Sequence, residues 1–151
     1  MTTAQFLRAL RKDQAGAAVI EFAILAPAII AMMLGVFQVG IALQNYNALR
    51  NASAEVARYA LVQYGTGNML TDDQLRDYAI SVGRGAPYLL NSDRLIAKVT
   101  TPATQRVVGA MEKNLEVEYQ IPTVFEAMGL RGPYISYSRP MFMVTAAAPA
   151  P

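Results

Sequence analysis

The sequence predicts an α+β fold, in which a long N-terminal helix precedes a small domain with a short helix and a three- to four-stranded antiparallel sheet. Three observations lead to this fold class. The first is an uncharged apolar run of 22 residues, Phe22–Leu43, and the second is its amphipathic continuation. The third is a C-terminal half in which apolar and polar residues alternate. Helical patterns followed by strand patterns are typical of α+β folds.

The composition narrows the function classes. The 151 residues include no Cys, His or Trp, and 54% of them are hydrophobic. Thiolate nucleophiles, imidazole bases and the usual nitrogen or sulfur metal ligands are therefore excluded. We expect a protein that is not an enzyme and that uses no cofactor and no metal. Beyond Gly16, basic and acidic residues are equally numerous and the cations are scattered, so we expect no nucleic-acid binding.

The run Phe22–Leu43 predicts one transmembrane helix. At about 1.5 Å per residue it would span roughly 33 Å, enough for a bilayer core of about 30 Å. Arg8, Arg11 and Lys12 precede the run, whereas the first cation after it is Arg50. The positive-inside rule then places the N-terminus, with its basic leader 1–16, in the cytoplasm and the C-terminal domain across the membrane.

Two other interpretations of this run stay open. A secretory signal peptide also has a basic start and an apolar middle, and Ala26-Pro27-Ala28 resembles a cleavage site. That site falls inside the apolar run, after a short hydrophobic region. The other interpretation is a buried helix of a soluble domain. It is weakened because the run is apolar on every face and carries no stripe.

Glu21 is an acidic residue at the border of the apolar run. A carboxylate near the headgroups costs much less than one at the bilayer centre, so a border residue that reaches the interface explains it. Gly16 and the small uncharged residues after it suggest another role. Cleavage after Gly16 would give Ala17 an α-amine and make Glu21 the fifth residue of the product. In an array of helices this carboxylate would pair with a neighbour's amine and set the axial register.

The stretch Gly16–Ala60, GAAVIEFAILAPAIIAMMLGVFQVGIALQNYNALRNASAEVARYA, resembles the TadE-like family of minor pseudopilins of tight-adherence (Tad or Flp) type IV pilus systems. The pair Glu21 and Phe22, Pro27, a glycine-containing middle and the downstream EVARYA carry the resemblance. Major Flp pilins are much shorter and typically have Glu-Tyr. The Glu-Phe pair and the length of this chain therefore favour a minor subunit.

The resemblance implies a function and partners. An inner-membrane prepilin peptidase would cut between Gly16 and Ala17. The mature chain would act with other pilins or pseudopilins and the assembly platform to initiate, prime or cap an adhesion pilus. It would lie in the bacterial inner membrane with a periplasmic domain, and would in some cases enter the extracellular pilus. The alternative is an unprocessed single-pass anchor whose periplasmic domain binds an envelope component.

Pro27, Gly35 and Gly40 are the special residues of the predicted membrane helix, 17–43. Proline removes one helical hydrogen bond and tends to kink a helix, which membrane helices tolerate. Functionally, Pro27 would be a site where the helix melts locally when it leaves lipid for a fibre. The two glycines and the many alanines would give a flat surface for close helix packing.

Residues 44–64 predict an amphipathic extension of the helix. Glu55 and Arg58 are spaced for an (i, i+3) ion pair on its solvent side. The sequence GTGN at residues 65–68 ends the helix. The apolar positions that define the buried face are Ala48, Leu49, Ala52, Val56, Ala60 and Leu61.

A periplasmic α+β domain is expected over residues 65–146, beginning with a short helix. Thr71 and Gln74 match a capping box, and the helix should end near Val82, before Gly83, Gly85 and Pro87. The tightest acidic cluster, Asp72, Asp73 and Asp77, lies on this helix. We interpret it as acids favoured by the helix dipole, because no loop with EF-hand spacing is present.

Three later segments predict antiparallel strands: RLIAKVT, NLEVEYQI and YISYSRPMFMVT. The middle one alternates, with Leu115, Val117, Tyr119 and Ile121 on the face opposite Glu116, Glu118 and Gln120.

Pro140 and two residues of the loop that precedes it add to the strand predictions. Pro140 suggests that the last strand is an edge strand or contains a bulge. Thr123 and Glu126 predict another capping box and one helical turn that closes near Gly129. Residues 147–151 predict a disordered tail.

Overall fold

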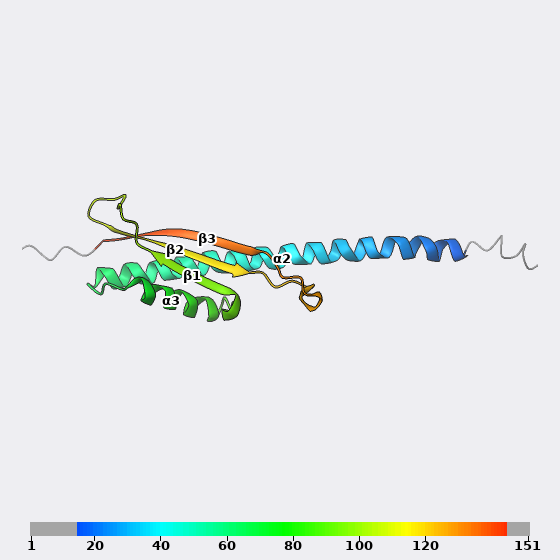
Figure 1. Ribbon diagram of the computed structural model, residues 1–151, viewed down its shortest axis with the longest axis horizontal. Helices are drawn as coiled ribbons and strands as arrows, with labels where there is room; N and C mark the ends of the chain where they lie inside the picture. The colour runs from blue at the N-terminus through cyan, green and yellow to red at the C-terminus, as the bar shows by residue number, and fades with distance from the viewer. Residues whose placement is uncertain (1–14, 145–151) are drawn as a thin grey trace, which may run out of the picture. The chain divides into compact units, whose positions relative to one another are not determined.

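The computed structural model describes residues 15–144, so most of the expected leader and the expected tail lie outside the described residues. The helices and strands follow in the order α2 (Ala15–Gly65), α3 (Asp72–Arg84), η1 (Ser92–Arg94), β1 (Leu95–Thr100), β2 (Met111–Gln120), η2 (Glu126–Met128) and β3 (Tyr134–Met143) (Figure 1). This order confirms the predicted α+β class. The chain divides into two compact units, Met1–Val39 and Gly40–Pro151.

In the first unit, the described residues form the N-terminal part of α2. From Gly16 to Val39 every residue is exposed except Ala26, Leu34 and Gln38, which are half-buried. The helix continues through Pro27. A Cβ atom added at Gly35 would meet nothing within 4 Å. This part of α2 is therefore uncovered on all sides.

The second unit contains a three-stranded sheet of order β1-β2-β3, antiparallel throughout. The central strand is β2, in which Val117 lies opposite Ala97 on one side and Tyr137 on the other. The predicted alternation is confirmed: Leu115 and Tyr119 are buried, and Ile121 is buried one residue beyond the strand.

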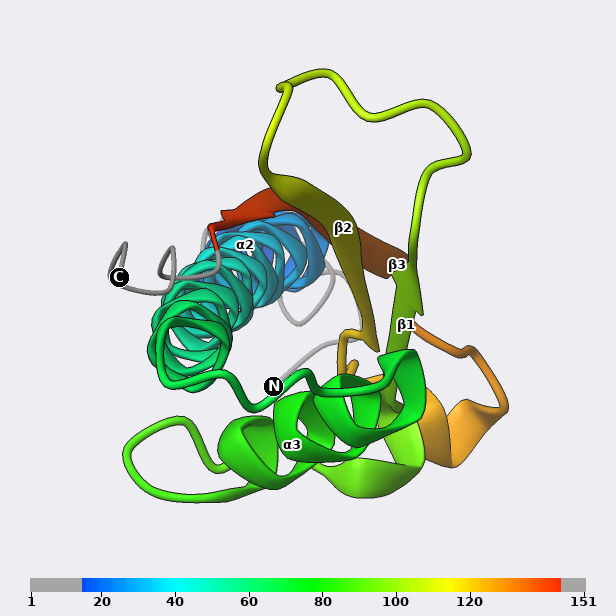
Figure 2. The same ribbon diagram turned by 90° about the vertical axis from the view of Figure 1, so that its left-hand side faces the viewer.

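Both helices of the second unit cover the same face of this sheet, as Figure 2 shows in a view along α2. Apolar side chains from α2, α3 and the inner sheet face form one core. The core residues are Leu49, Val56, Ala57, Ala60, Tyr64, Leu70, Leu75, Ala79, Leu90, Leu95, Ala97, Val99, Leu115, Val117, Tyr119, Met141 and Met143.

The buried stripe of α2 follows the predicted helical spacing up to Ala60. The prediction for Leu61 is wrong, because its side chain is 47% exposed. Each helical residue turns the side chain by about 100°, so the position after Ala60 leaves the buried face. Tyr64 continues the stripe and is buried. The helix ends at Gly65, where the glycine-rich stop was expected.

The capping box of α3 is confirmed. The backbone N–H of Thr71 donates to Gln74 Oε1 at 2.9 Å, and the N–H of Gln74 donates to Thr71 Oγ1 at 3.2 Å. The helix runs through Gly83 to Arg84, slightly beyond the predicted end. Gly83 is instead a contact point, because a Cβ atom there would lie 2.7 Å from a methyl of Leu95 in β1.

The second predicted capping box is only half formed. The N–H of Thr123 donates to Glu126 Oε1 at 3.3 Å, but Thr123 Oγ1 accepts from Phe125 and not from Glu126. The expected single turn is present as η2, and it closes at Gly129, which has a φ of 80°. Pro140 lies in the edge strand β3, in register with Asn114, so the edge interpretation is confirmed.

Candidate functional site

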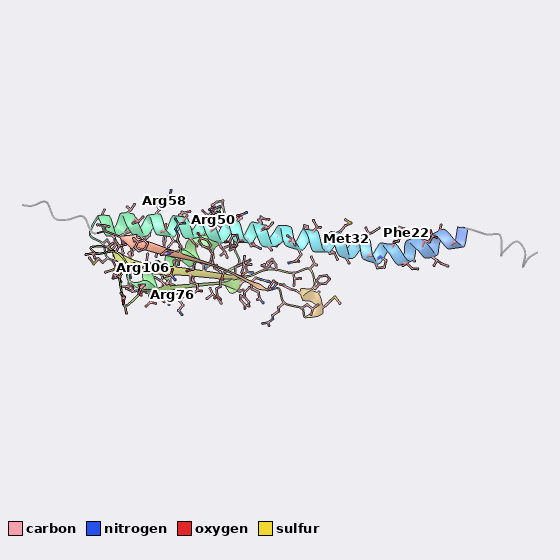
Figure 3. The ribbon with its side chains drawn as sticks, turned by 90° about the horizontal axis from the view of Figure 1, so that it is seen from above. Phe22, Met32, Arg50, Arg58, Arg76 and Arg106 are labelled. Atoms are coloured by element: carbon pink, nitrogen blue, oxygen red, sulfur yellow. The ribbon has the colours of Figure 1, made fainter. Side chains whose placement is uncertain are left out.

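The candidate processing and assembly residues lie together at the start of α2. Gly16, Ala17, Glu21 and Phe22 are all exposed, and Figure 3 shows Phe22 projecting from the helix. Ala15, Ala17 and Ala18, which flank Gly16, are strong helix formers. Glu21 is the one charged residue between Ala15 and Arg50. A neighbouring chain that packed on this surface would therefore meet a single carboxylate in an otherwise apolar surface.

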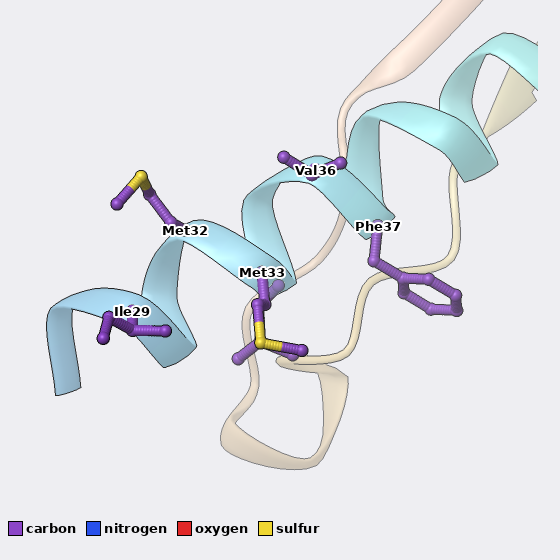
Figure 4. Close-up of a pocket in the computed structure, with 6 residues that line it drawn as sticks. Ile29, Met32, Met33, Val36 and Phe37 are labelled. Carbon is purple, nitrogen blue, oxygen red and sulfur yellow. The ribbon is translucent and has the colours of Figure 1, made fainter. Parts of the chain in front are cut away.

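The surface that follows Glu21 is apolar around the whole helix. A shallow hollow on it is lined by Ile29, Met32, Met33, Leu34, Val36 and Phe37, whose side chains point away from the helix axis in more than one direction (Figure 4). Successive residues such as Met32 and Met33 point about 100° apart, so no rotation of the helix would hide all of them against one partner face.

This apolar helix is compatible with a single-pass membrane anchor. By length and composition α2 can cross a membrane, and none of its most apolar window is buried. A core helix of a soluble domain would be covered by its own protein, which argues against that alternative. Exposed apolar surface of this extent on a soluble chain would be a large association site.

The acidic cluster on α3 is divided between two cations. Arg76 donates to Asp73 Oδ1 at 2.8 Å and to Asp77 Oδ1 at 3.0 Å. Asp72 instead accepts from Lys113 of β2 and, at 3.2 Å, from the Thr101 hydroxyl. These carboxylates therefore do not converge on one point.

Lys113 is a buried cation that the sequence interpretation did not single out. Its side chain is 7% exposed, and its Nζ donates to Asp72 and, at 3.3 Å, to the carbonyl of Leu70. The hydroxyl of Tyr64 donates to the same carbonyl at 2.8 Å. The sequence did indicate this burial, because Lys113 lies two residues before Leu115 and therefore on the same face of β2. The network connects the end of α2, the start of α3 and β2.

The predicted ion pair between Glu55 and Arg58 is wrong. Glu55 Oε2 accepts a hydrogen bond of 3.2 Å from the hydroxyl of Tyr88, which lies beyond α3. Burial and this hydrogen bond raise the pKa of Tyr88 above its ordinary value. Arg58 is exposed with Arg50 on the side of α2 away from the sheet, as Figure 3 shows.

The outer face of the sheet is polar. Glu116 lies opposite Lys98 and Ser138, and Glu118 lies opposite Ser136. Both carboxylates are half-buried on the face turned away from the helices. They occupy the polar face that the alternation of β2 predicted, and on this face Ser138 Oγ donates to Asn114 Oδ1 at 3.1 Å.

An ion pair with Arg94 holds the β2–β3 loop. Arg94, the last residue of η1, donates to both carboxylate oxygens of Glu126, at 2.5 and 2.7 Å. This bidentate geometry is the strong form of a charge-assisted hydrogen bond. Together with the Thr123 N–H, it lowers the pKa of Glu126 to about 2. Sequence reasoning placed Glu126 only in a local cap and missed its partner 32 residues away.

Comparison with known proteins supports the resemblance. The family model of TadE-like protein matches residues 16–58. This range contains Gly16, Glu21 and Pro27, and it confirms the resemblance predicted from the sequence over this segment. No curated protein and no solved structure gives a significant match. The match points to a protein associated with Tad pili.

The lowered pKa of Glu126 predicts a pH-dependent stability. Because the folded pKa lies below the usual value of 4.5, the stabilisation is full above about pH 4.5 and is lost as the pH falls towards 2. We expect Glu126→Gln to lower the thermal unfolding midpoint at pH 7 and to differ less from the parent chain as the pH approaches 2. Circular dichroism of the full chain in detergent micelles measures both.

Arg94→Gln is the matched variant, since removing the cation removes the main cause of the shift. It should abolish the same pH-dependent part of the stability. A difference between Glu126→Gln and the parent chain that stays constant from pH 7 to pH 2 would contradict the role of the ion pair.

Proposed function

Because the chain is TadE-like over residues 16–58, we propose that it is a minor pseudopilin that takes part in the assembly of a Tad-type adhesion pilus. Phe22–Leu43 anchors it in the bacterial inner membrane, with the N-terminus in the cytoplasm and the C-terminal domain in the periplasm. A prepilin peptidase cuts it after Gly16. The mature chain then acts with other pilins or pseudopilins and the assembly platform, as an initiating, priming or tip subunit.

The observation that carries this proposal is the contrast between the two parts of α2. Up to Val39 the helix is uncovered, whereas from Leu49 to Tyr64 one face of it belongs to the core of a folded domain. A subunit built in this way can exchange lipid for neighbouring helices around its uncovered part while its domain stays folded. A pilus subunit needs this property when it leaves the membrane.

Glu21 gives the uncovered helix a means of setting its register. After cleavage, the amine of Ala17 would lie about one turn from Glu21 of the same chain. Both groups would be at the N-terminus of the helix, where the helix dipole disfavours a positive charge and favours a negative one. A neighbouring helix shifted along the axis can place its own amine next to this carboxylate. Away from water, an unpaired charge is costly, so the pair favours the one shift that brings both charges together.

Pro27, Gly35 and Gly40 complete the proposed assembly surface. Pro27 removes one hydrogen bond of α2, so the helix can melt locally there when it leaves lipid. Cβ atoms would meet nothing within 4 Å at Gly35 or Gly40, so these positions leave room for a neighbouring backbone.

The second candidate function is an unprocessed single-pass anchor with an envelope-binding domain. The same uncovered helix and folded domain support it, because neither requires proteolysis. The two candidates differ in the fate of the peptide bond between Gly16 and Ala17.

The first prediction concerns this bond. We expect the chain from cells with the prepilin peptidase to begin at Ala17, and the chain from cells that lack it to retain the leader. Intact mass and N-terminal sequencing of the protein purified from membranes measure the difference. A chain that keeps its leader in both strains would favour the unprocessed anchor.

The second prediction concerns Glu21. Breaking a buried ion pair costs about 3–5 kcal/mol, so Glu21→Gln should lower incorporation into assembled complexes at least about a hundredfold. Co-purification with partner pilins measures incorporation. Glu116→Gln makes the same change on the outer sheet face and should assemble as the parent chain does. Normal assembly and processing of Glu21→Gln would refute the register role.

A further inference from the structure

We propose that the β2–β3 loop, residues 121–133, lies in the lipid headgroup layer on the side of the membrane where α2 emerges. The partner is therefore a phospholipid surface, and the contact would seat the domain against the membrane. This inference rests on the proposed membrane span and assigns a second membrane contact to the chain.

The loop lies at the end of the second unit where α2 enters it. The rings of Tyr46 in α2 and Tyr137 in β3 meet edge to face, with centroids 6.1 Å apart. At the other end of the unit, Tyr64 and Lys113 share the carbonyl of Leu70. The start of β3 therefore lies beside the early part of α2 in this unit, and the start of β2 lies beside its end.

The loop joins the end of β2 to the start of β3, so it lies at the early end of α2 in this unit. From Tyr137 back to Tyr134 the strand covers about 10 Å. A helix covers that distance in about seven residues. Counted from Tyr46 towards the N-terminus of α2, this places Tyr134 at about the level of Gly40. Gly40–Leu43 are the last residues of the uncharged run. If that run spans the bilayer, the loop is at the membrane surface.

The loop exposes large apolar side chains. Met128 is 76% exposed and Leu130 is 59% exposed, although both are large apolar residues. Val124, Phe125 and Tyr134 are exposed next to them. Apolar side chains together with an interfacial tyrosine are typical of segments that enter the boundary between headgroups and acyl chains.

The charges of the loop suit the same partner. Arg131 is exposed, and with Arg94, Gln120, Glu126 and Gly129 it lines a polar hollow beside the apolar tip. Arg94 neutralises Glu126 through the bidentate pair. The loop therefore presents a net positive charge from Arg131, which a lipid phosphate can bind.

Backbone and side-chain hydrogen bonds hold the loop in place with its apolar side chains outward. The N–H of Ile121 donates to the carbonyl of Pro133 at 3.0 Å, and Gln120 Nε2 donates to the carbonyl of Gly132 at 3.3 Å. A Cβ atom at Gly132 would lie 1.9 Å from the carbonyl oxygen of Ile121, so only glycine fits there. An ordered loop loses little conformational freedom when it enters the headgroup layer.

Exposure alone does not select this loop. Val108 in the β1–β2 loop is 102% exposed, but that loop lies at the far end of the unit, beside the end of α2. The proposed bilayer is on the other side of the domain. Val108 is therefore a matched control: an apolar residue in a loop of the same sheet, expected to remain in water.

The test uses the absence of cysteine from the chain. Met128→Cys, Leu130→Cys, Val108→Cys and Val36→Cys are labelled one at a time with a nitrobenzoxadiazole fluorophore in the full chain. The proteins are reconstituted into liposomes of phosphatidylcholine and phosphatidylglycerol that carry nitroxides on the headgroup or deep on an acyl chain. Circular dichroism establishes that each labelled variant is folded.

We expect the headgroup nitroxide to quench probes at Met128 and Leu130 at least about twofold more than the probe at Val108. The deep nitroxide should quench the probe at Val36. Arg131→Glu, added to Met128→Cys, should reduce the headgroup quenching in these anionic liposomes, because it replaces the attracting charge with a repelling one.

The outcomes separate this inference from the proposed function. If the probe at Val36 is not quenched, the membrane span itself is wrong. If Val36 is quenched but Met128 and Leu130 behave like Val108, the span stands and the loop contact is overturned. Probes at Met128 and Leu130 that are shielded in cell membranes but not in liposomes would show that a protein covers the loop, which also overturns the lipid contact.

Discussion

The structure depends on one constraint: the apolar surface of α2 is much longer than the domain that could cover it. Leu49, Val56 and Tyr64 lie in the core of the second unit, whereas large apolar residues up to Leu43 remain exposed. Burial of apolar surface is the main favourable term in folding and association. In the function proposed above, lipid or the helices of neighbouring subunits cover the exposed part of α2, and the helix passes from this environment into the folded domain near Leu43.

The domain is built so that it does not need this second environment. Several of its buried or half-buried charges are matched internally, among them Lys113 by Asp72, and Glu126 by Arg94. A lone charge in these positions would be costly, and pairing removes that cost. In the proposed function, the domain would thus stay folded while the uncovered helix exchanges lipid for neighbouring helices. Glu21 differs, because it lies on the uncovered helix, where its proposed partner belongs to another subunit.

Local patterns predicted much of the fold, because they depend on neighbouring residues. The alternation of Leu115, Val117 and Tyr119 and the capping box of Thr71 are examples. Partner choice between distant side chains was not predictable. Glu55 accepts a hydrogen bond from Tyr88, which lies beyond α3 in the sequence. Lys113 is buried because the end of α2 and the start of α3 pack against β2 at this position. The proposed roles of Gly16 and Glu21 would depend on other proteins, so for these residues only the TadE-like match over residues 16–58 adds to the sequence pattern.

The most direct test of the account is a nitroxide scan along α2, with single cysteines from Ile24 to Val62 in the full chain in bilayers. Collision rates with oxygen and with a nickel complex are measured at each position. We predict high oxygen and low nickel accessibility up to about Leu43 with no helical period, followed by a period of about 3.6 residues with minima at Leu49, Val56 and Ala60. Nickel accessibility with that same period before Leu43 would mean that water reaches one side of the helix, and would contradict the account.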